Sequence, residues 1–130
     1  MSDAIKIVCI EDDFDLTDIL KVILKGRGFK VTAAVGGLEG LETLRRVKPD
    51  IVLLDLMMPE MDGWDVCERM QADADLCNIP VIIVTADGRP ATRARALEVA
   101  KVDGFIVKPF DIQELVQRIE GVLGSDCLVQ

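Results

Sequence analysis

The sequence predicts an α/β fold in which five strands alternate with five helices. Two observations lead to this prediction. Short, almost continuous apolar runs recur along the chain, as is typical of strands buried on both faces. Each run is followed by a longer segment whose apolar residues recur at helical spacing. Because connections of this length join parallel strands, we expect a doubly wound three-layer (βα)5 sandwich around one parallel sheet.

The first strand is expected over Ile5–Ile10, and it stops at the acidic run Glu11–Asp13. The apolar residues that follow recur at helical spacing and predict the first helix: Leu16, Ile19, Leu20, Ile23 and Leu24. Gly26 and Gly28 end this helix, since glycine is favoured just past a helix terminus.

The second strand is expected over Phe29–Ala34, followed by a turn at Gly36-Gly37. The second helix closes before Pro49, and its apolar side is formed by Leu38, Leu41 and Leu44. The third strand, Ile51–Leu54, is entirely aliphatic and ends at Asp55.

The third helix is expected over Trp64–Met70 after a loop at Pro59–Gly63, with Trp64 assigned to packing. A polar connection leads to the fourth strand, Pro80–Thr85. Pro90 suits the first turn of a fourth helix that runs to about Lys101.

The fifth strand is expected over Gly104–Val107, and Lys108-Pro109 forms the turn after it. Asp111 is a candidate N-cap for the last helix, whose apolar residues are Ile112, Leu115, Val116, Ile119, Val122 and Leu123. Among doubly wound sheets we favour the strand order 2-1-3-4-5, the flavodoxin-like order, which places the reversal of chain direction between strands one and three.

The chain has 130 residues, a net charge of −8 and no histidine. This length suits a single domain, which we place at residues 1–124, followed by a short tail at 125–130. The negative charge disfavours direct binding to nucleic acid or to anionic membranes. No apolar window approaches the roughly 20 residues that span a bilayer, and the N-terminus shows no export signal. We therefore expect a cytoplasmic protein without membrane insertion.

The four cysteines form no Cys-x-x-Cys pair; they are Cys9, Cys67, Cys77 and Cys127. We expect reduced structural thiols, not disulfides or a zinc site.

Polar residues lie at or just past the carboxyl ends of four predicted strands: Glu11, Asp12, Asp55, Thr85 and Lys108. In a parallel sheet these ends share one edge. Crowded carboxylates without histidine or thiol ligands suit Mg²⁺ or Mn²⁺. Asp55 can then act as a nucleophile on phosphorus, with Lys108 and Thr85 facing the phosphoryl oxygens.

Each of these residues also has a structural explanation when it is taken alone. The acids after the first strand could be helix N-caps, and Thr85 could be an ordinary strand residue. Lys108 could be a solvated turn lysine, and Phe105 a core aromatic. Only their joint placement at one edge favours a functional site.

Four segments of the sequence carry a resemblance to a known family: Ile10–Asp13, Leu54–Gly63, Thr85-Ala86 and Phe105–Phe110. In this order and at these spacings they resemble the receiver domain of two-component response regulators, and the resemblance spans essentially the whole chain. It implies phosphorelay signal transduction, in which Asp55 accepts a phosphoryl group from a phosphohistidine on a sensor histidine kinase or a histidine phosphotransfer protein. It also implies a phosphoacceptor domain with self-phosphorylation and autodephosphorylation chemistry, and no other enzymatic activity.

The resemblance further implies a ligand set for Mg²⁺, for which Mn²⁺ can substitute. Asp12 and Asp55 would bind the ion through their carboxylates, Met57 through its backbone carbonyl and Glu11 through a water molecule. The acidic run leaves open whether Glu11 and Asp12 or Asp12 and Asp13 serve the metal.

By the same resemblance, Thr85 and Lys108 contact the phosphoryl oxygens, and Lys108-Pro109 is a cis peptide that directs the lysine toward the site. Phe105 corresponds to the switch aromatic, which turns inward as Thr85 moves.

The sequence departs from the family pattern at two residues near the expected site and in the segment before the fifth strand. Met57 and Asp87 occupy places that tune how fast water attacks the phosphoryl group, so we expect them to set its lifetime. The segment Val99–Asp103 is one residue longer than usual and lacks the customary glycine before the fifth strand.

The output surface implied by the resemblance consists of the fourth helix, the fifth strand and the fifth helix. It would bind a downstream protein target or support a homodimer. Arg89, Arg93 and Arg95 give the fourth helix a basic start, which is either a solvated face or a docking patch. Because only Gly124–Gln130 follows the fifth helix, we expect a stand-alone regulator or a receiver excised from a longer protein.

Three alternative functions remain at this stage. A degenerate receiver would act as a phosphorylation-independent interaction module. A Mg²⁺-dependent phosphohydrolase of the haloacid dehalogenase type would need a second aspartate where this chain has Met57. A flavodoxin-like nucleotide binder would need a glycine- or hydroxyl-rich phosphate loop in place of Glu11–Asp13.

Overall fold

Five short parallel strands form the central sheet of the protein. The structure is a computed structural model, and it describes residues 4–124. The strands are β1 (Ile5–Ile10), β2 (Phe29–Ala34), β3 (Ile51–Leu54), β4 (Val81–Thr85) and β5 (Gly104–Val107). They lie in the order β2-β1-β3-β4-β5, and every neighbouring pair is parallel. Both the predicted strand order and the predicted (βα)5 class are confirmed, and β4 begins one residue later than expected.

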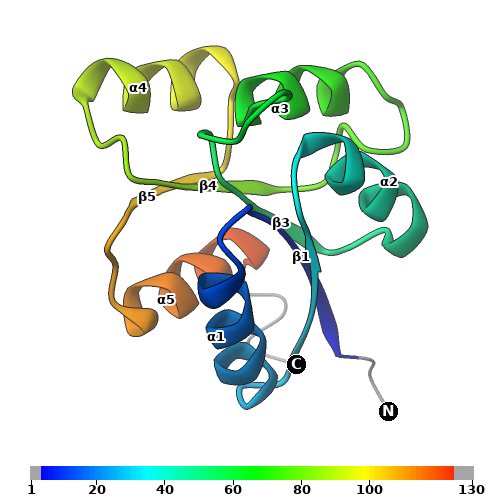
Figure 1. The fold of residues 1–130 in the computed structure, drawn as a ribbon, viewed down its shortest axis with the longest axis vertical. Coiled ribbons are helices and arrows are strands. Elements are labelled where there is room, and N and C mark those ends of the chain that lie inside the picture. Colours follow the sequence, from blue (N-terminus) through cyan, green and yellow to red (C-terminus); the bar gives the residue numbers. More distant parts are fainter. Residues whose placement is uncertain (1–3, 125–130) are drawn as a thin grey trace.

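Helices cover both faces of the sheet, which completes the three layers (Figure 1). Helices α1 (Phe14–Lys25) and α5 (Ile112–Leu123) lie on one face. Helices α2 (Gly37–Val47), α3 (Gly63–Gln71) and α4 (Pro90–Ala94) lie on the other.

Alternate strand residues enter two separate hydrophobic cores. In β3, Ile51 and Leu53 pack with the α1 and α5 layer, whereas Val52 and Leu54 pack with the α2, α3 and α4 layer. All four side chains are at most 1% exposed. Burying such an aliphatic side chain stabilises a fold by about 1.5–3 kcal/mol. Because β3 is buried in both cores, it holds the backbone of the next residue, Asp55, firmly in place.

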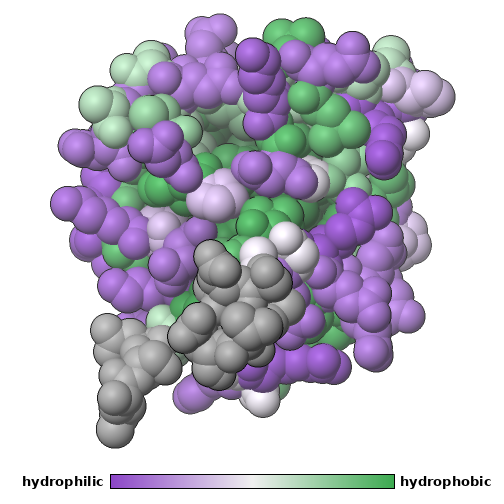
Figure 2. Space-filling model, turned by 180° about the vertical axis from the view of Figure 1, so that it is seen from behind, coloured by the Kyte–Doolittle hydropathy of each residue, from purple (hydrophilic) through white to green (hydrophobic). Residues whose placement is uncertain are grey.

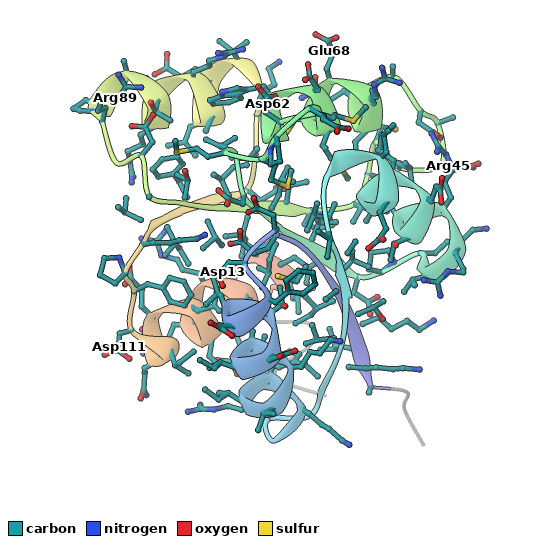
Figure 3. All side chains as sticks on the ribbon, viewed as in Figure 1. Asp13, Arg45, Asp62, Glu68, Arg89 and Asp111 are labelled. Atoms are coloured by element: carbon teal, nitrogen blue, oxygen red, sulfur yellow. The ribbon has the colours of Figure 1, made fainter. Side chains whose placement is uncertain are left out.

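Aspartates begin three of the helices: Asp13 at α1, Asp62 at α3 and Asp111 at α5 (Figure 3). The carboxylate of Asp13 accepts a hydrogen bond of 3.2 Å from the backbone N–H of Leu16. Asp111 accepts one of 2.8 Å from the N–H of Gln113, which confirms its predicted capping role. A side-chain cap of this kind is worth about 1 kcal/mol.

The fourth helix differs from the prediction. The α-helix ends at Ala94 and continues as a π-helix, η1 (Arg95–Val99), in which the N–H of Ala100 donates to the carbonyl of Arg95 at 2.9 Å. A π-helical turn takes in one residue more than an α-helical turn. Beyond the π-helix the chain passes through Lys101, which has a φ of 56°, and the extra residue expected within Val99–Asp103 remains a prediction.

One predicted core residue of α1 lies at the surface. Leu20 and Leu24 are buried, but Ile19 is 53% exposed. Consecutive residues of a helix are rotated by about 100° around its axis. When α1 directs Leu20 at the sheet, the neighbouring Ile19 therefore points away from the core and toward solvent. On the face drawn in Figure 2, hydrophilic side chains cover most of the surface and hydrophobic ones show between them. Within residues 4–124, no helix is both long enough and apolar enough to cross a membrane.

Candidate functional site

Two carboxylates meet at the carboxyl edge of the sheet because β1 and β3 are neighbours. Ile10 pairs with Leu54, so the residues that follow them, Glu11 and Asp55, leave the sheet side by side. The N–H of Asp55 donates to the carbonyl of Ile10 at 3.0 Å, which fixes this register. Glu11 is only 3% exposed and Asp55 only 5% exposed. Their charges therefore have little water to solvate them.

A third carboxylate, from Asp12, joins this pair. Glu11, Asp12 and Asp55 each present an oxygen within 4.8 Å of the others. Asp12 is exposed, whereas Asp13 is turned away to cap α1. Carboxylates this close repel one another, and a hard divalent cation relieves the repulsion. The all-oxygen donor set fits Mg²⁺, which binds through one or two carboxylates and keeps several waters.

Met57 lies in the loop after Asp55, and its backbone N–H donates a 3.1 Å hydrogen bond to Asp55 Oδ1. Its side chain points outward and is 62% exposed. The N–H fixes the orientation of the Asp55 carboxylate. The metal-binding role of the Met57 carbonyl and the effect of its side chain on water remain predictions.

Lys108 supplies the positive charge of the site. Its Nζ forms an ion pair with Glu11 Oε1 and lies 3.4 Å from Asp55 Oδ2. The Lys108 N–H donates to the carbonyl of Thr85 at 2.8 Å, and the Lys108-Pro109 peptide is cis. Burial lowers the pKa of Lys108, but the contacts with Glu11 and Asp55 outweigh burial and raise the pKa above its ordinary value. The lysine is therefore a permanent cation facing both carboxylates.

The crowding of charges has its clearest effect on the pKa of Glu11. Burial and the neighbouring Asp55 raise the pKa of Glu11 to about 7, although Lys108 acts in the opposite direction. Glu11 Oε2 also accepts hydrogen bonds from the N–H groups of Asp12 and Asp13, at 3.1 and 3.4 Å. Two buried carboxylates thus share a single ammonium group, and the site holds an excess of negative charge.

Thr85 ends β4 at the same edge and is fully buried. Its Oγ1 accepts a 3.2 Å hydrogen bond from the N–H of Asp87. Phe105, in β5, pairs with Ile83 and packs within the core beneath α3 and α4. The guanidinium of Arg93 lies 6.0 Å from the centroid of the Phe105 ring. The ring is thus buried, and its predicted role as a switch remains a prediction.

The Asp87 carboxylate is directed at the beginning of α4. It accepts hydrogen bonds of 2.8 Å from Arg89 Nε, from Arg89 Nη2 and from Thr92 Oγ1. The contacts with Arg89 and Thr92 lower the pKa of Asp87. Thr92 was not identified from the sequence as a partner of Asp87. Arg95 is not simply solvated either, since its guanidinium lies 4.1 Å from the Trp64 ring centroid.

Gly63 is a second residue whose importance the sequence did not reveal. A Cβ at this position would lie 2.6 Å from the carbonyl oxygen of Asp55 and 2.7 Å from the Cα of Leu56. Both distances are shorter than real carbon contacts allow. Only glycine lets the first turn of α3 pack directly against the backbone that carries Asp55.

The strand order defines a flavodoxin-like α/β domain, and a carboxylate cluster that could hold a metal ion lies at its topological switch point. A family model described as the response regulator receiver domain matches residues 7–120, and the chain belongs to this family. The resemblance noted in the sequence is thereby confirmed, and the chain is a receiver domain of the two-component response regulators.

Curated relatives and a solved structure agree with this assignment. The chain is 33% identical over 118 residues to the DNA-binding dual master transcriptional regulator RpaA of Synechocystis sp., covering 91% of this chain and 48% of that protein. It is 36% identical over 118 residues to the DNA-binding response regulator MtrA of Mycolicibacterium paratuberculosis, covering 91% of this chain and 51% of that protein. The chain therefore spans about half the length of the curated relatives it matches.

A crystal structure of the signal receiver domain of a signal transduction histidine kinase from Syntrophus aciditrophicus has the same fold. It superposes with a TM-score of 0.83 at 33% identity, covering 92% of this chain and 90% of that chain.

Proposed function

We propose that Asp55 accepts a phosphoryl group, in a Mg²⁺-dependent reaction, from a phosphohistidine on a sensor histidine kinase or a histidine phosphotransfer protein. One observation supports this most strongly. The buried Asp55 carboxylate has a lysine Nζ 3.4 Å from one oxygen and two further carboxylates within 4.8 Å. This arrangement combines a nucleophile, a permanent cation and a site for a divalent ion.

In the proposed reaction, an Asp55 oxygen forms a bond to phosphorus while the bond between phosphorus and the histidine nitrogen breaks. The imidazole keeps the electron pair and takes up a proton. Lys108 neutralises charge on the transferred group, and the Thr85 hydroxyl donates to one of its oxygens. The N–H of Met57 holds the nucleophilic carboxylate in place throughout. The domain's own chemistry would be limited to this transfer and to hydrolysis of the aspartyl phosphate, in which water attacks phosphorus and releases inorganic phosphate and the Asp55 carboxylate, so it would not act as an enzyme on other substrates.

Asp12 and Asp55 would hold Mg²⁺ through their carboxylates, with Glu11 acting through a water molecule and Met57 through its carbonyl. When bound, the ion supplies positive charge to the phosphoryl oxygens. Mn²⁺ prefers the same oxygen ligands and should substitute.

The proposed output is a change at the surface formed by α4, β5 and α5. Thr85 and Phe105 would act as the switch, because Thr85 ends β4 and Phe105 packs beneath the helices of that side. A downstream protein, or a second copy of the chain, would bind this surface in the cytoplasm. No direct contact with nucleic acid is proposed for these residues, since the chain has a net charge of −8.

Incubation with acetyl phosphate and Mg²⁺, followed by intact mass measurement, tests the proposal. The wild type should gain one phosphoryl group, and Asp55→Asn should gain none. An adduct that forms equally on Asp55→Asn would contradict the assignment of the nucleophile. No adduct on either protein would favour a degenerate receiver that acts without phosphorylation.

A further inference from the structure

We propose that Arg89 and Thr92 are positioning residues that, together with Asp87, restrain the loop after β4 and oppose the movement of Thr85 on phosphorylation. We call Asp87, Arg89 and Thr92 the Asp87 latch. The inference rests on the proposed function of Asp55, and it adds a control on how readily the phosphorylated conformation forms.

The latch joins the loop to the first turn of α4 through both oxygens of Asp87. Oδ1 accepts from the Arg89 backbone N–H at 3.1 Å and from Arg89 Nε at 2.8 Å. Oδ2 accepts from Arg89 Nη2 and from Thr92 Oγ1, both at 2.8 Å. Bidentate pairing of arginine with a carboxylate fixes geometry as well as charge. The carboxylate is therefore held toward α4, and Arg89 marks the outer end of this helix in Figure 3.

The backbone of the same residue is tied to the phosphorylation site. The N–H of Asp87 donates to Thr85 Oγ1 at 3.2 Å. If the Thr85 hydroxyl moves toward a phosphoryl group on Asp55, this bond must lengthen or Asp87 must follow. Because the Asp87 side chain is bound to Arg89 and Thr92, Asp87 can follow only if the latch breaks or α4 moves with it.

The surroundings of the loop limit how else it can adjust. A Cβ on Gly88 would lie 3.0 Å from both methyl carbons of Val107, so the loop packs tightly against β5. Thr92 is buried, whereas the Arg89 side chain is 79% exposed. Thr92 is therefore held in a fixed position, whereas water competes for the contact of Arg89 with Asp87. This combination suits a restraint that can open.

The latch also changes the expected role of Asp87. A carboxylate at this position would repel the anionic phosphoryl group or orient an attacking water if it faced the site. Here its charge is paired with Arg89, and both oxygens are occupied. Its influence on the phosphorylated state should therefore depend on Arg89 and Thr92.

Beryllium fluoride, a mimic of the phosphoryl group, provides the equilibrium test. Its affinity at saturating Mg²⁺ should be measured by calorimetry for the wild type, Arg89→Ala and Thr92→Val. Each variant should bind about two- to fivefold more tightly, because the contacts removed are weak and oppose the bound conformation. Mg²⁺ affinity should change little, and the free energy of unfolding should fall by no more than the gain in beryllium fluoride binding, whereas a purely structural role would lower stability without tightening binding. Arg46→Ala, which removes an exposed charge from α2, is the matched control and should bind like the wild type.

A double mutant isolates the latch from other effects of the arginine. In an Asp87→Ala background, Arg89→Ala should have no further effect on beryllium fluoride affinity, since its partner is already absent. Unchanged or weaker binding by both single variants would overturn the latch alone. Failure of the wild type to bind beryllium fluoride would overturn both the latch and the phosphoacceptor function.

Discussion

The ion pairs around Lys108 and at Arg89 both join carboxylates to a cation, but they differ in the balance of their charges. At the ends of β1 and β3, Lys108 faces the buried carboxylates of Glu11 and Asp55. At the start of α4, Arg89 pairs with the single carboxylate of Asp87. The first group keeps an excess of negative charge, whereas in the second the one positive and the one negative charge cancel.

This difference in charge fits the two proposed roles, a reactive site around Asp55 and a restraint at Asp87. Burial raises the cost of the unbalanced negative charges around Asp55, so that group gains most from a divalent cation. At Asp87 the arginine side chain is exposed, so water and salt screen the pair and it can be broken at a smaller cost. Removing a charge should therefore have a large effect in the first group and a small one in the second.

The largest expected effect is that of Lys108→Ala. Removing one preorganised donor from an oxyanion hole costs about 10²–10³-fold in rate, and we expect the initial rate of phosphorylation by acetyl phosphate to fall by a similar factor. Arg89→Ala should stay within a few-fold of the wild type in the same mass-based assay. A Lys108→Ala rate within threefold of the wild type would show that the lysine does not stabilise the transferred group.

Asp12 and Asp13 form a matched pair that resolves the remaining ambiguity in the metal site. Asp12→Asn should lower Mg²⁺ affinity by about tenfold or more, since it removes one of the two carboxylates that we propose bind the ion directly. Asp13→Asn should leave the affinity unchanged, because asparagine caps a helix as well as aspartate does. Calorimetric titration with Mg²⁺ measures both. A comparable loss of affinity in both variants would assign the metal to Asp12 and Asp13.

Because of Glu11, the stability of the folded protein should depend on pH. Its pKa is raised from 4.5 to about 7 in the folded protein, so the folded state holds this proton more tightly than the unfolded chain does. The resulting stabilisation is fully present below pH 4.5 and is lost as the pH rises toward and above 7. Urea unfolding in EDTA should show this loss in the wild type and not in Glu11→Gln. Parallel pH profiles for the two proteins would contradict the assignment.

The smallest expected effect lies outside both charged groups, at Lys101. A non-glycine residue in the left-handed region costs on the order of 1 kcal/mol, so Lys101→Gly should raise the free energy of unfolding by up to that amount. Lys21→Gly, within α1, should lower it by about 1 kcal/mol, because glycine is unfavourable inside a helix. Urea midpoints provide the measurement. If both substitutions destabilise the protein equally, the backbone at Lys101 is not strained.

The sequence predicted the sheet well because its signals are strong and local. Runs such as Ile51–Leu54 fit few structures other than a strand buried on both faces, and the helices between them require parallel strands. From that topology alone, Glu11, Asp55, Thr85 and Lys108 were expected at one edge, and the structure brings them there.

Details that depend on packing could not be predicted in this way. The π-helix over Arg95–Val99 depends on how the end of the fourth helix packs, which sequence periodicity does not specify. The exposure of Ile19 depends on how α1 is rotated against the sheet. The partners of Asp87 depend on side-chain directions, which neither periodicity nor composition specifies.

The most direct measurement of the central claim is chemical location of the phosphoryl group. An aspartyl phosphate is reduced by borohydride to homoserine, so peptide mass spectrometry of protein treated with acetyl phosphate, Mg²⁺ and then borohydride identifies the modified residue. We predict homoserine at position 55, and none when Mg²⁺ is replaced by EDTA. Homoserine at Asp12 or Asp13, or equal labelling in EDTA, would contradict the account.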